Sequence, residues 1–156
     1  MAYSVFISYS TQDLATAEAL RTWITAAGAE SFLAKYSLEP GRPLAADLMA
    51  AIQRCDLFLL LWSQNAKASD WVPQEIGVAR GAGRVIVPVV LQRGLTLPGF
   101  INDLKYLPIY EDSNAAVQWL RSDIAGRVQD KQLGIFIGLV LAILALVALF
   151  GGKQRS

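Results

Sequence analysis

The 156-residue sequence contains no histidine and only one cysteine, Cys55, and these two shortages exclude common kinds of site. Without histidine the commonest general base is missing, and a zinc site is not expected. A single cysteine allows no internal disulfide, which is consistent with a reducing compartment, and we interpret Cys55 as a small core residue. The 14 basic and 13 acidic residues give a net charge of only +1, so the chain lacks the basic footprint of a nucleic-acid-binding protein.

The first ten residues, MAYSVFISYS, lack the basic start and the long apolar run of a signal peptide. Charge is missing instead from residues 133–150, LGIFIGLVLAILALVALF, which contain no charged or polar side chain. At about 1.5 Å per residue, this run and the next two glycines approach the hydrocarbon thickness of a bilayer, roughly 30 Å. We therefore expect a single-pass C-terminal membrane helix over 133–152, the lipid bilayer as a partner, and a tail over 153–156. Basic residues flank the run on both sides, and we favour a cytoplasmic domain because nothing in the sequence would export it.

Short apolar runs alternate with helical patterns through residues 1–128, and residues 129–132 form a short connector. The expected strands are 3–9, 29–34, 56–62, 85–91 and 106–110, the expected helices are 14–27, 44–54, 71–81 and 114–128, and the expected loops include 35–43 and 63–69. The first helix should bury Leu14, Ala17, Leu20 and Ile24, and Pro88 predicts a bulge or an edge in the fourth strand. This alternation predicts an α/β domain, a flavodoxin-like five-stranded parallel sheet in the order 2-1-3-4-5 with helices on both faces.

In that strand order the chain reverses direction between the first and third strands, and ligands bind beyond the carboxyl ends of the strands at this point. Ser8-Tyr9-Ser10 follows the first strand, and the segment from Trp62 onward follows the third. The stretch SDWVPQEIG, residues 69–77, opens the next helix and carries Trp71 and Glu75. Topology therefore places these residues near the expected pocket.

Four stretches, taken in order, resemble the TIR domain family: FISYSTQD (6–13), LEPG (38–41), DLFLLLWS (56–63) and WVPQE (71–75). The resemblance covers about residues 3–128 and is specific as an ordered series, since no single motif is strong. It implies the five-stranded fold predicted above. It also implies one of two activities, because many TIR domains are NAD glycohydrolases or cyclases and others are adaptors that only assemble.

In the enzymatic members a glutamate of a W-x-x-x-E helix motif is catalytic, and a nearby tryptophan stacks in the nucleotide site. The resemblance therefore implies that Glu75 is catalytic. The candidate substrate-binding residues are Trp71, Ser8, Tyr9, Ser10 and Arg42. Many TIR domains carry an aspartate at the end of the second strand, where this sequence has Ala34, so the role of the following loop stays open.

Cleavage of the nicotinamide–ribose bond needs little proton transfer, because nicotinamide departs as a neutral molecule. A single carboxylate can stabilise the oxocarbenium-like transition state and accept hydrogen bonds from the ribose hydroxyls, so the missing histidine is no obstacle. We expect no metal and no cofactor, with NAD as the substrate. Structural interpretations stay open: Glu75 as a solvated helix charge, Trp71 as a packing residue, Ser8 and Ser10 as helix caps, and Arg42 as a surface residue.

The apolar run predicts a membrane anchor, and the resemblance implies a TIR enzyme that converts NAD to ADP-ribose or a cyclic product in prokaryotic anti-phage immune signalling. Its expected partners are other TIR domains in a homo-oligomer and an unknown activating partner or ligand. Gly134 and Gly138, with Ala142 on the same helical face, would allow close helix pairing in a bilayer. The alternative is a catalytically silent adaptor that acts by TIR–TIR oligomerisation at the membrane, and a third hypothesis makes the span itself a membrane-disrupting effector.

Overall fold

Within the apolar run DLFLLLW, residues 57–62 form a strand whose residues are all buried, and this strand is the centre of a five-stranded parallel sheet. The strands are β1 (Ser4–Ser8), β2 (Glu30–Leu33), β3 (Leu57–Trp62), β4 (Val85–Val90) and β5 (Leu107–Pro108). Their order, β2-β1-β3-β4-β5, confirms the predicted flavodoxin-like arrangement, and every neighbouring pair is parallel. The structure is a computed structural model that describes residues 1–34 and 46–151, so the expected loop over 35–43 and its Arg42 lie outside the described residues.

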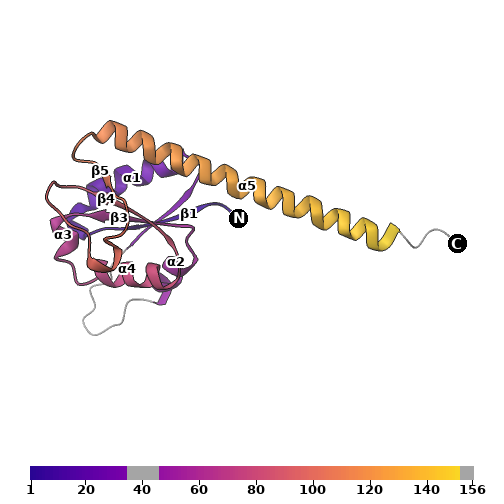
Figure 1. Cartoon of the computed structure of the whole chain (residues 1–156), viewed down its shortest axis with the longest axis horizontal. Helices are drawn as coiled ribbons and strands as arrows, with labels where there is room; N and C mark the ends of the chain where they lie inside the picture. The colour runs from indigo at the N-terminus through magenta and orange to yellow at the C-terminus, as the bar shows by residue number, and fades with distance from the viewer. Residues whose placement is uncertain (35–45, 152–156) are drawn as a thin grey trace.

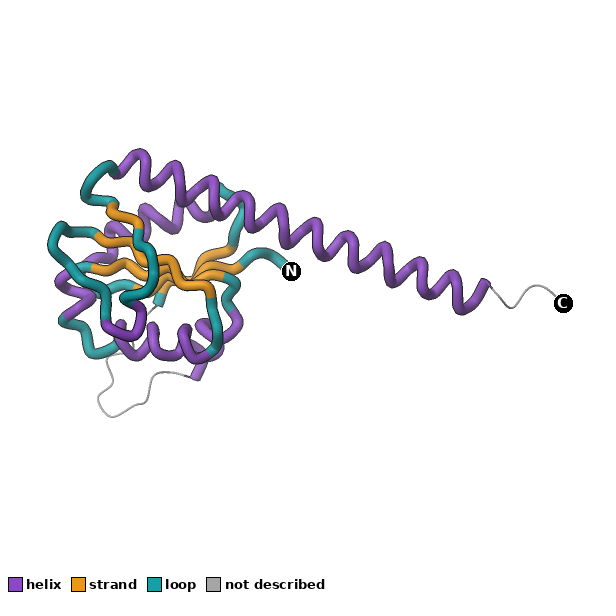
Figure 2. Tube along the Cα trace, viewed as in Figure 1, coloured by secondary structure: helices purple, strands orange, loops and turns teal. Residues whose placement is uncertain are grey.

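Helices cover both faces of the sheet, as the alternating pattern predicted (Figure 1). They are α1 (Leu14–Ala26), α2 (Ala46–Arg54), α3 (Gln64–Lys67), α4 (Val72–Gly81) and α5 (Ser113–Gly151), with two short 3-10 helices at Thr11–Asp13 and Gly99–Ile101. α1 and α5 pack together on one face, and α2 and α4 on the other, as the trace in Figure 2 shows. The helix α3 lies in a segment that we had expected to be a loop.

The buried stripe of α1 consists of Ala17, Leu20 and Ile24, as predicted, but Leu14 is exposed. At 3.6 residues per turn, Leu14 lies about 90° around the helix from the centre of that stripe, so it cannot share the buried face. Gly28 follows the helix at φ +91°, a left-handed conformation that glycine adopts without steric cost. The chain then turns into β2.

Pro88 lies within β4 without a bulge, because the pairing of β4 with β3 is continuous from Val85 to Val90. On the other side, β5 pairs only with Val89 and Val90. The missing N–H of proline therefore falls where β4 is locally an edge, and the edge alternative is the correct one.

The closing helix, the connector 129–132 and most of the expected span form one continuous helix, α5, rather than separate elements. Its first half buries Ala116, Leu120, Ile124 and Val128 against the domain, whereas the described apolar side chains from Leu133 to Leu146 are exposed. By length and composition, this helix is long and apolar enough to cross a membrane. The division of the chain at residues 128, 132 and 152 stays a prediction.

Candidate active site

The carboxyl end of β1 and the start of α4 bring together two of the predicted site residues, Ser8 and Glu75. Glu75 has no exposed surface, and neither has Ser8. The Ser8 hydroxyl donates a 2.5 Å hydrogen bond to Oε2 of Glu75, across the interface between strand and helix. Glu75 is thus not the solvated charge that a lone glutamate near a helix start usually is, and Ser8 uses its hydroxyl on the carboxylate instead of capping a helix.

Local sequence explains why α4 begins where it does. The Ser69 hydroxyl accepts hydrogen bonds from the backbone N–H groups of Trp71 at 3.2 Å and Val72 at 3.3 Å. Pro73 is tolerated in the first turn because its missing N–H would have no partner within the helix there. Glu75 also lies in the first turn, where the partial positive charge of the helix N-terminus stabilises a carboxylate.

Tyr9 and Ser10 continue the chain from β1 and are both buried. Burial raises the pKa of the Tyr9 phenol, and the negative charges of Glu18 and Glu75 raise it further, so the phenol stays protonated at neutral pH. The Ser10 side chain makes no capping hydrogen bond to the 3-10 helix that follows, although its carbonyl accepts from the Asp13 N–H at 2.7 Å. The interpretation of Ser10 as a side-chain cap is therefore wrong.

A polar cluster that the sequence analysis missed joins the loop after β1 to the turn after β3. The Ser63 hydroxyl donates to one Asp13 oxygen at 2.5 Å, and the Asn65 amide donates to the other at 3.0 Å. Ser63 Oγ also accepts from the Ala66 N–H at 2.9 Å and so caps α3. Because Ser63 follows β3 directly, its place at the carboxyl end of a central strand was the signal that could have identified it.

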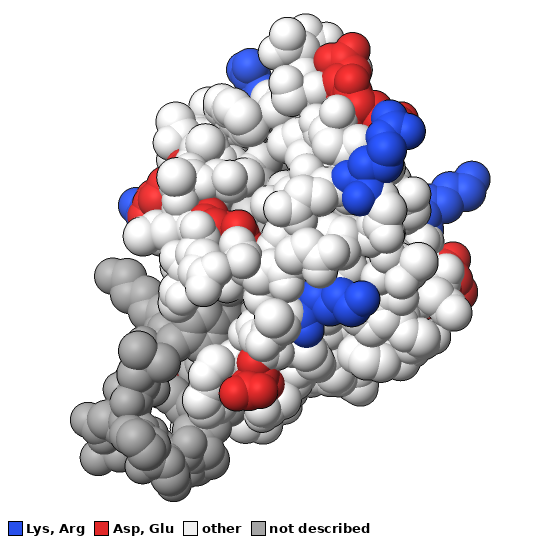
Figure 3. Space-filling view, turned by 90° about the vertical axis from the view of Figure 1, so that its left-hand side faces the viewer, with Lys and Arg blue, Asp and Glu red and all other residues white. Residues whose placement is uncertain are grey.

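A hollow of about 280 Å³ opens beside this cluster. It is lined by Ser10, Thr11, Gln12, Asn65, Ala68, Ser69, Asp70 and Trp71. Two predicted substrate-binding residues, Ser10 and the half-buried Trp71, therefore share one hollow, and Trp71 lies one helical turn before Glu75. Glu75, Ser8 and Tyr9 are not among its lining residues. Figure 3 views the domain from this end, and its described surface shows basic and acidic side chains scattered singly rather than gathered in a stripe of one sign.

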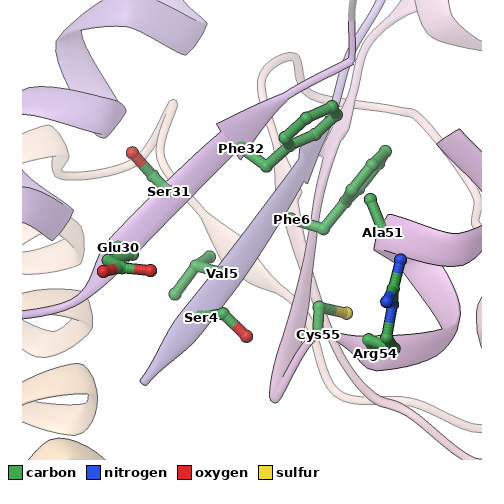
Figure 4. Close-up of a pocket in the computed structure, with 9 residues that line it drawn as sticks. All are labelled: Ser4, Val5, Phe6, Glu30, Ser31, Phe32, Ala51, Arg54 and Cys55. Atoms are coloured by element: carbon green, nitrogen blue, oxygen red, sulfur yellow. The ribbon is translucent and has the colours of Figure 1, made fainter. Parts of the chain in front are cut away.

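A second hollow, also about 280 Å³, lies over the amino halves of β1 and β2 (Figure 4). Its apolar wall includes Phe6 and Phe32, whose rings stack with centroids 5.5 Å apart. Cys55 also lines it, but burial raises the pKa of the thiol to about 11, so the reactive thiolate is scarce at neutral pH. This hollow lies at the opposite end of the strands from Glu75. Among the described residues, no three His, Cys, Asp or Glu side chains gather in a way that could hold a metal ion.

Comparison with known proteins agrees with the fold and with the family that the sequence resembles. The TIR domain of the Toll-related receptor TRR-2 from Hydra magnipapillata superposes with a TM-score of 0.62 at 24% identity, covering 77% of this chain and 96% of that one. A TIR-STING receptor from C. gigas (TM-score 0.56, 20% identity, 76% and 40% covered) and the CMP N-glycosidase BcmB from Clostridium botulinum (0.54, 20%, 75% and 97%) share the fold. No curated protein matches the sequence significantly. The sequence model of the family described as TIR domain matches residues 5–121, and the chain therefore belongs to the TIR domain family.

Proposed function

We propose that this chain is a TIR enzyme that cleaves the bond between nicotinamide and ribose in NAD. The observation that carries the proposal is the position of Glu75, a carboxylate without exposed surface at the carboxyl end of the sheet. Burying a carboxylate costs several kcal/mol unless its partners compensate, so such groups concentrate where chemistry needs them. The carboxyl end of an open α/β sheet at its topological switch point is also where ligands bind.

In the proposed reaction, the bond between C1′ of the ribose and the pyridinium nitrogen breaks, and its electron pair leaves with a neutral nicotinamide. Because Glu75 has no exposed surface before substrate binds, binding must uncover its carboxylate. The uncovered carboxylate then stabilises the positive charge that develops on the sugar and accepts hydrogen bonds from the ribose hydroxyls. Ser8 fixes the orientation of that carboxylate, and Trp71 provides an aromatic wall for stacking. Water that attacks C1′ and releases a proton gives ADP-ribose, whereas attack by a nucleophile of the same molecule gives a cyclic product. A CMP N-glycosidase with the same fold supports this class of reaction.

We further propose that α5 anchors the enzyme in a membrane, with the TIR domain on the cytoplasmic side. The described apolar side chains of α5 beyond the domain are exposed to solvent over several turns, and a bilayer would bury them. Close packing at Gly134 and Gly138 would bring TIR domains together, and an activating partner or ligand would control this assembly. We also propose that the enzyme acts in prokaryotic anti-phage immune signalling, a role that the family resemblance implies.

The test uses the full chain reconstituted at high density in liposomes, incubated with NAD, with products identified by mass. The wild type should release nicotinamide, and Glu75→Gln should lower the rate at least about 100-fold while the thermal unfolding midpoint shows a folded chain. Glu18→Gln is the matched control, because Glu18 is an exposed glutamate of α1 paired with Arg21 at 3.3 Å. Unchanged nicotinamide release from Glu75→Gln or Glu75→Ala would refute the proposal.

A catalytically silent adaptor is the second candidate, and one observation favours it. The hydrogen bond from Ser8 to the fully buried Glu75 links β1 to α4, which a purely structural residue would also do. An adaptor predicts no NAD turnover even in clustered liposomes. It also predicts a signalling phenotype that depends on Gly41 or Arg42, which lie outside the described residues, and not on Glu75.

A further inference from the structure

The first half of α5 runs along the whole length of the domain, and the second half extends beyond the domain. The helix starts beyond β5 at the carboxyl end of the sheet and runs back against the strand direction, so that its second half projects past the N-terminus (Figures 1 and 2). From Ser113 to Lys131 the helix covers about 27 Å. The segment from Asp56 to Ser63, which contains β3, covers about 23 Å. The docked half of α5 therefore matches the sheet in length and leaves the domain at the edge where the strands begin.

A polar clamp fixes α5 at this amino edge of the sheet. The Lys131 ammonium donates to Asp56 Oδ2 at 2.7 Å and to the Ala2 carbonyl at 2.9 Å, and it lies 5.9 Å from the centre of the Tyr3 ring. Asp56 in turn accepts from the Ser4 N–H at 2.8 Å and the Ser4 hydroxyl at 3.1 Å. One side chain of α5 is thus tied to the chain entering β1 and to the chain entering β3.

Packing adds a third contact at the same edge. A Cβ placed on Gly28, in the turn that leads into β2, would meet Val128 of α5 at 3.7 Å. No proline follows Pro108 in the sequence, and sharp kinks in helices arise mostly at proline and a few other defined causes. The helix therefore continues from the clamp into the apolar run with no evident hinge.

The clamp lies close to the point where the apolar run begins. Leu133 follows Lys131 by two residues, which is about 3 Å along the helix. The polar headgroup layer adds roughly 5–8 Å on each side of the hydrocarbon core. If the core begins at Leu133, then Lys131, Asp56 and Ala2 lie in the headgroup layer, where a lysine ammonium is favoured.

We propose that the amino edge of the sheet, residues 2–4, 54–56 and 84–85, rests on the headgroups of a phospholipid bilayer, and that the candidate active site faces away from the membrane. This inference rests on the proposed anchoring through α5. Arg54 and Val85 are exposed at this edge and contact the headgroups. Glu75 and the hollow beside Trp71 lie about 20 Å farther from the bilayer, at the other end of the strands. Neighbouring copies on one membrane then share a single orientation, with all their sites open to the aqueous phase.

The test measures the depth of three labels on the full chain in liposomes. Ala2→Cys and Val85→Cys place a fluorophore at the amino edge, and Lys67→Cys places one on α3 at the carboxyl edge. The wild-type thiol, Cys55, is buried and controls for background labelling. With nitroxides on the lipid headgroups, quenching should be at least about threefold stronger at positions 2 and 85 than at 67, because nitroxide quenching is confined to short range and the two edges are about 20 Å apart.

Breaking the clamp tests its role separately. Lys131→Ala should reduce the difference in quenching between the two edges, whereas Arg121→Ala, which removes the same charge from an exposed position on the same helix, should preserve it. Equal quenching at all three positions in a chain that resists carbonate extraction overturns the orientation and leaves the anchor intact. Release by carbonate overturns the anchor and the orientation together, and NAD cleavage, assayed independently, decides the enzymatic proposal. If the difference in quenching between the two edges is unchanged in Lys131→Ala, then the clamp does not orient the domain on the membrane.

Discussion

Asp56 and Glu75 lie at opposite ends of the sheet, where each joins separate elements, and the two carboxylates differ in their burial and their partners. Asp56, at the amino edge, keeps 28% of its side-chain surface exposed and is paired with the Lys131 ammonium. Glu75, at the carboxyl edge, has no exposed surface and accepts from the Ser8 hydroxyl. A carboxylate paired at the surface is easily explained by structure alone. A wholly enclosed carboxylate costs more to bury, so its place where ligands bind is the stronger sign of function.

After the Glu75 variants, Trp71→Ala should produce the largest effect at the carboxyl end of the sheet. Base-to-aromatic stacking contributes about 1–3 kcal/mol, so kcat/KM for NAD should fall roughly 5- to 160-fold. Trp71→Phe should recover part of this loss. Trp119→Ala is the control, because Trp119 is about half exposed on α5 and does not line the hollow beside Trp71. Equal kinetics for the two alanine variants would show that Trp71 only packs.

Ser8→Ala should have a smaller effect at the same end. Glu75 stays in place but loses the hydroxyl that orients Oε2, so we expect a fall of about tenfold in kcat with little change in KM. Ser8→Thr keeps a hydroxyl and should restore much of the rate. Steady-state kinetics of the full chain in liposomes measures both. A Ser8→Ala enzyme that is folded and fully active would remove Ser8 from the site.

The strand order could be predicted because it depends on patterns that one sequence carries. Apolar runs such as LFLLLW and the alternation of strands and helices leave few topologies for a parallel sheet. The exposure of Leu14 was missed because apolar spacing alone does not show which residues of α1 face the sheet. The buried face of this 13-residue helix begins at Ala17 and excludes Leu14, the first residue. The continuity of α5 was missed because 129–132, a polar segment between an amphipathic and an apolar pattern, was interpreted as a connector.

The candidate site could be predicted only in its residue types and its approximate place. The sequence placed Trp71 and Glu75 after a central strand, but it could not give the rotation of α4 that turns Glu75 toward β1. The contacts of Asp13 with Ser63 and Asn65 join residues 50 and 52 positions apart, so only the folded chain brings them together. The roles of Glu75 and the substrate-binding residues stay predictions until activity is measured.

Asp56→Asn should lower the stability of the fold and leave NAD cleavage unchanged. The amino edge of the sheet would then have a structural role and the carboxyl edge a catalytic one. The variant loses the charge that pairs with Lys131, and we expect the free energy of unfolding to fall by about 1 kcal/mol. Asp103→Asn is the matched control, since Asp103 pairs with Arg80 at 3.1 Å with 59% of its side-chain surface exposed, and it should cost less than about 0.5 kcal/mol. Urea unfolding of the full chain in detergent micelles, followed by tryptophan fluorescence, compares the two. A large loss of NAD cleavage in folded Asp56→Asn would contradict this separation.

The smallest expected effect is the pH dependence of the difference in unfolding free energy between wild type and Asp56→Asn. Its direction follows from the pKa of Asp56. Burial raises this pKa, but hydrogen bonds from Lys131 and Ser4 and the positive charge of Lys131 outweigh burial and hold it below its usual value. A carboxyl group whose pKa is lower in the folded chain stabilises the fold at any pH above its unfolded pKa, which is about 3.9. That contribution is lost as the pH falls through the folded pKa. The gap in unfolding free energy between wild type and Asp56→Asn should therefore be present at pH 7 and shrink below about pH 4, by less than about 1 kcal/mol because the side chain is partly exposed. A gap that widens on acidification would show that Asp56 does not stabilise the amino edge through its charge.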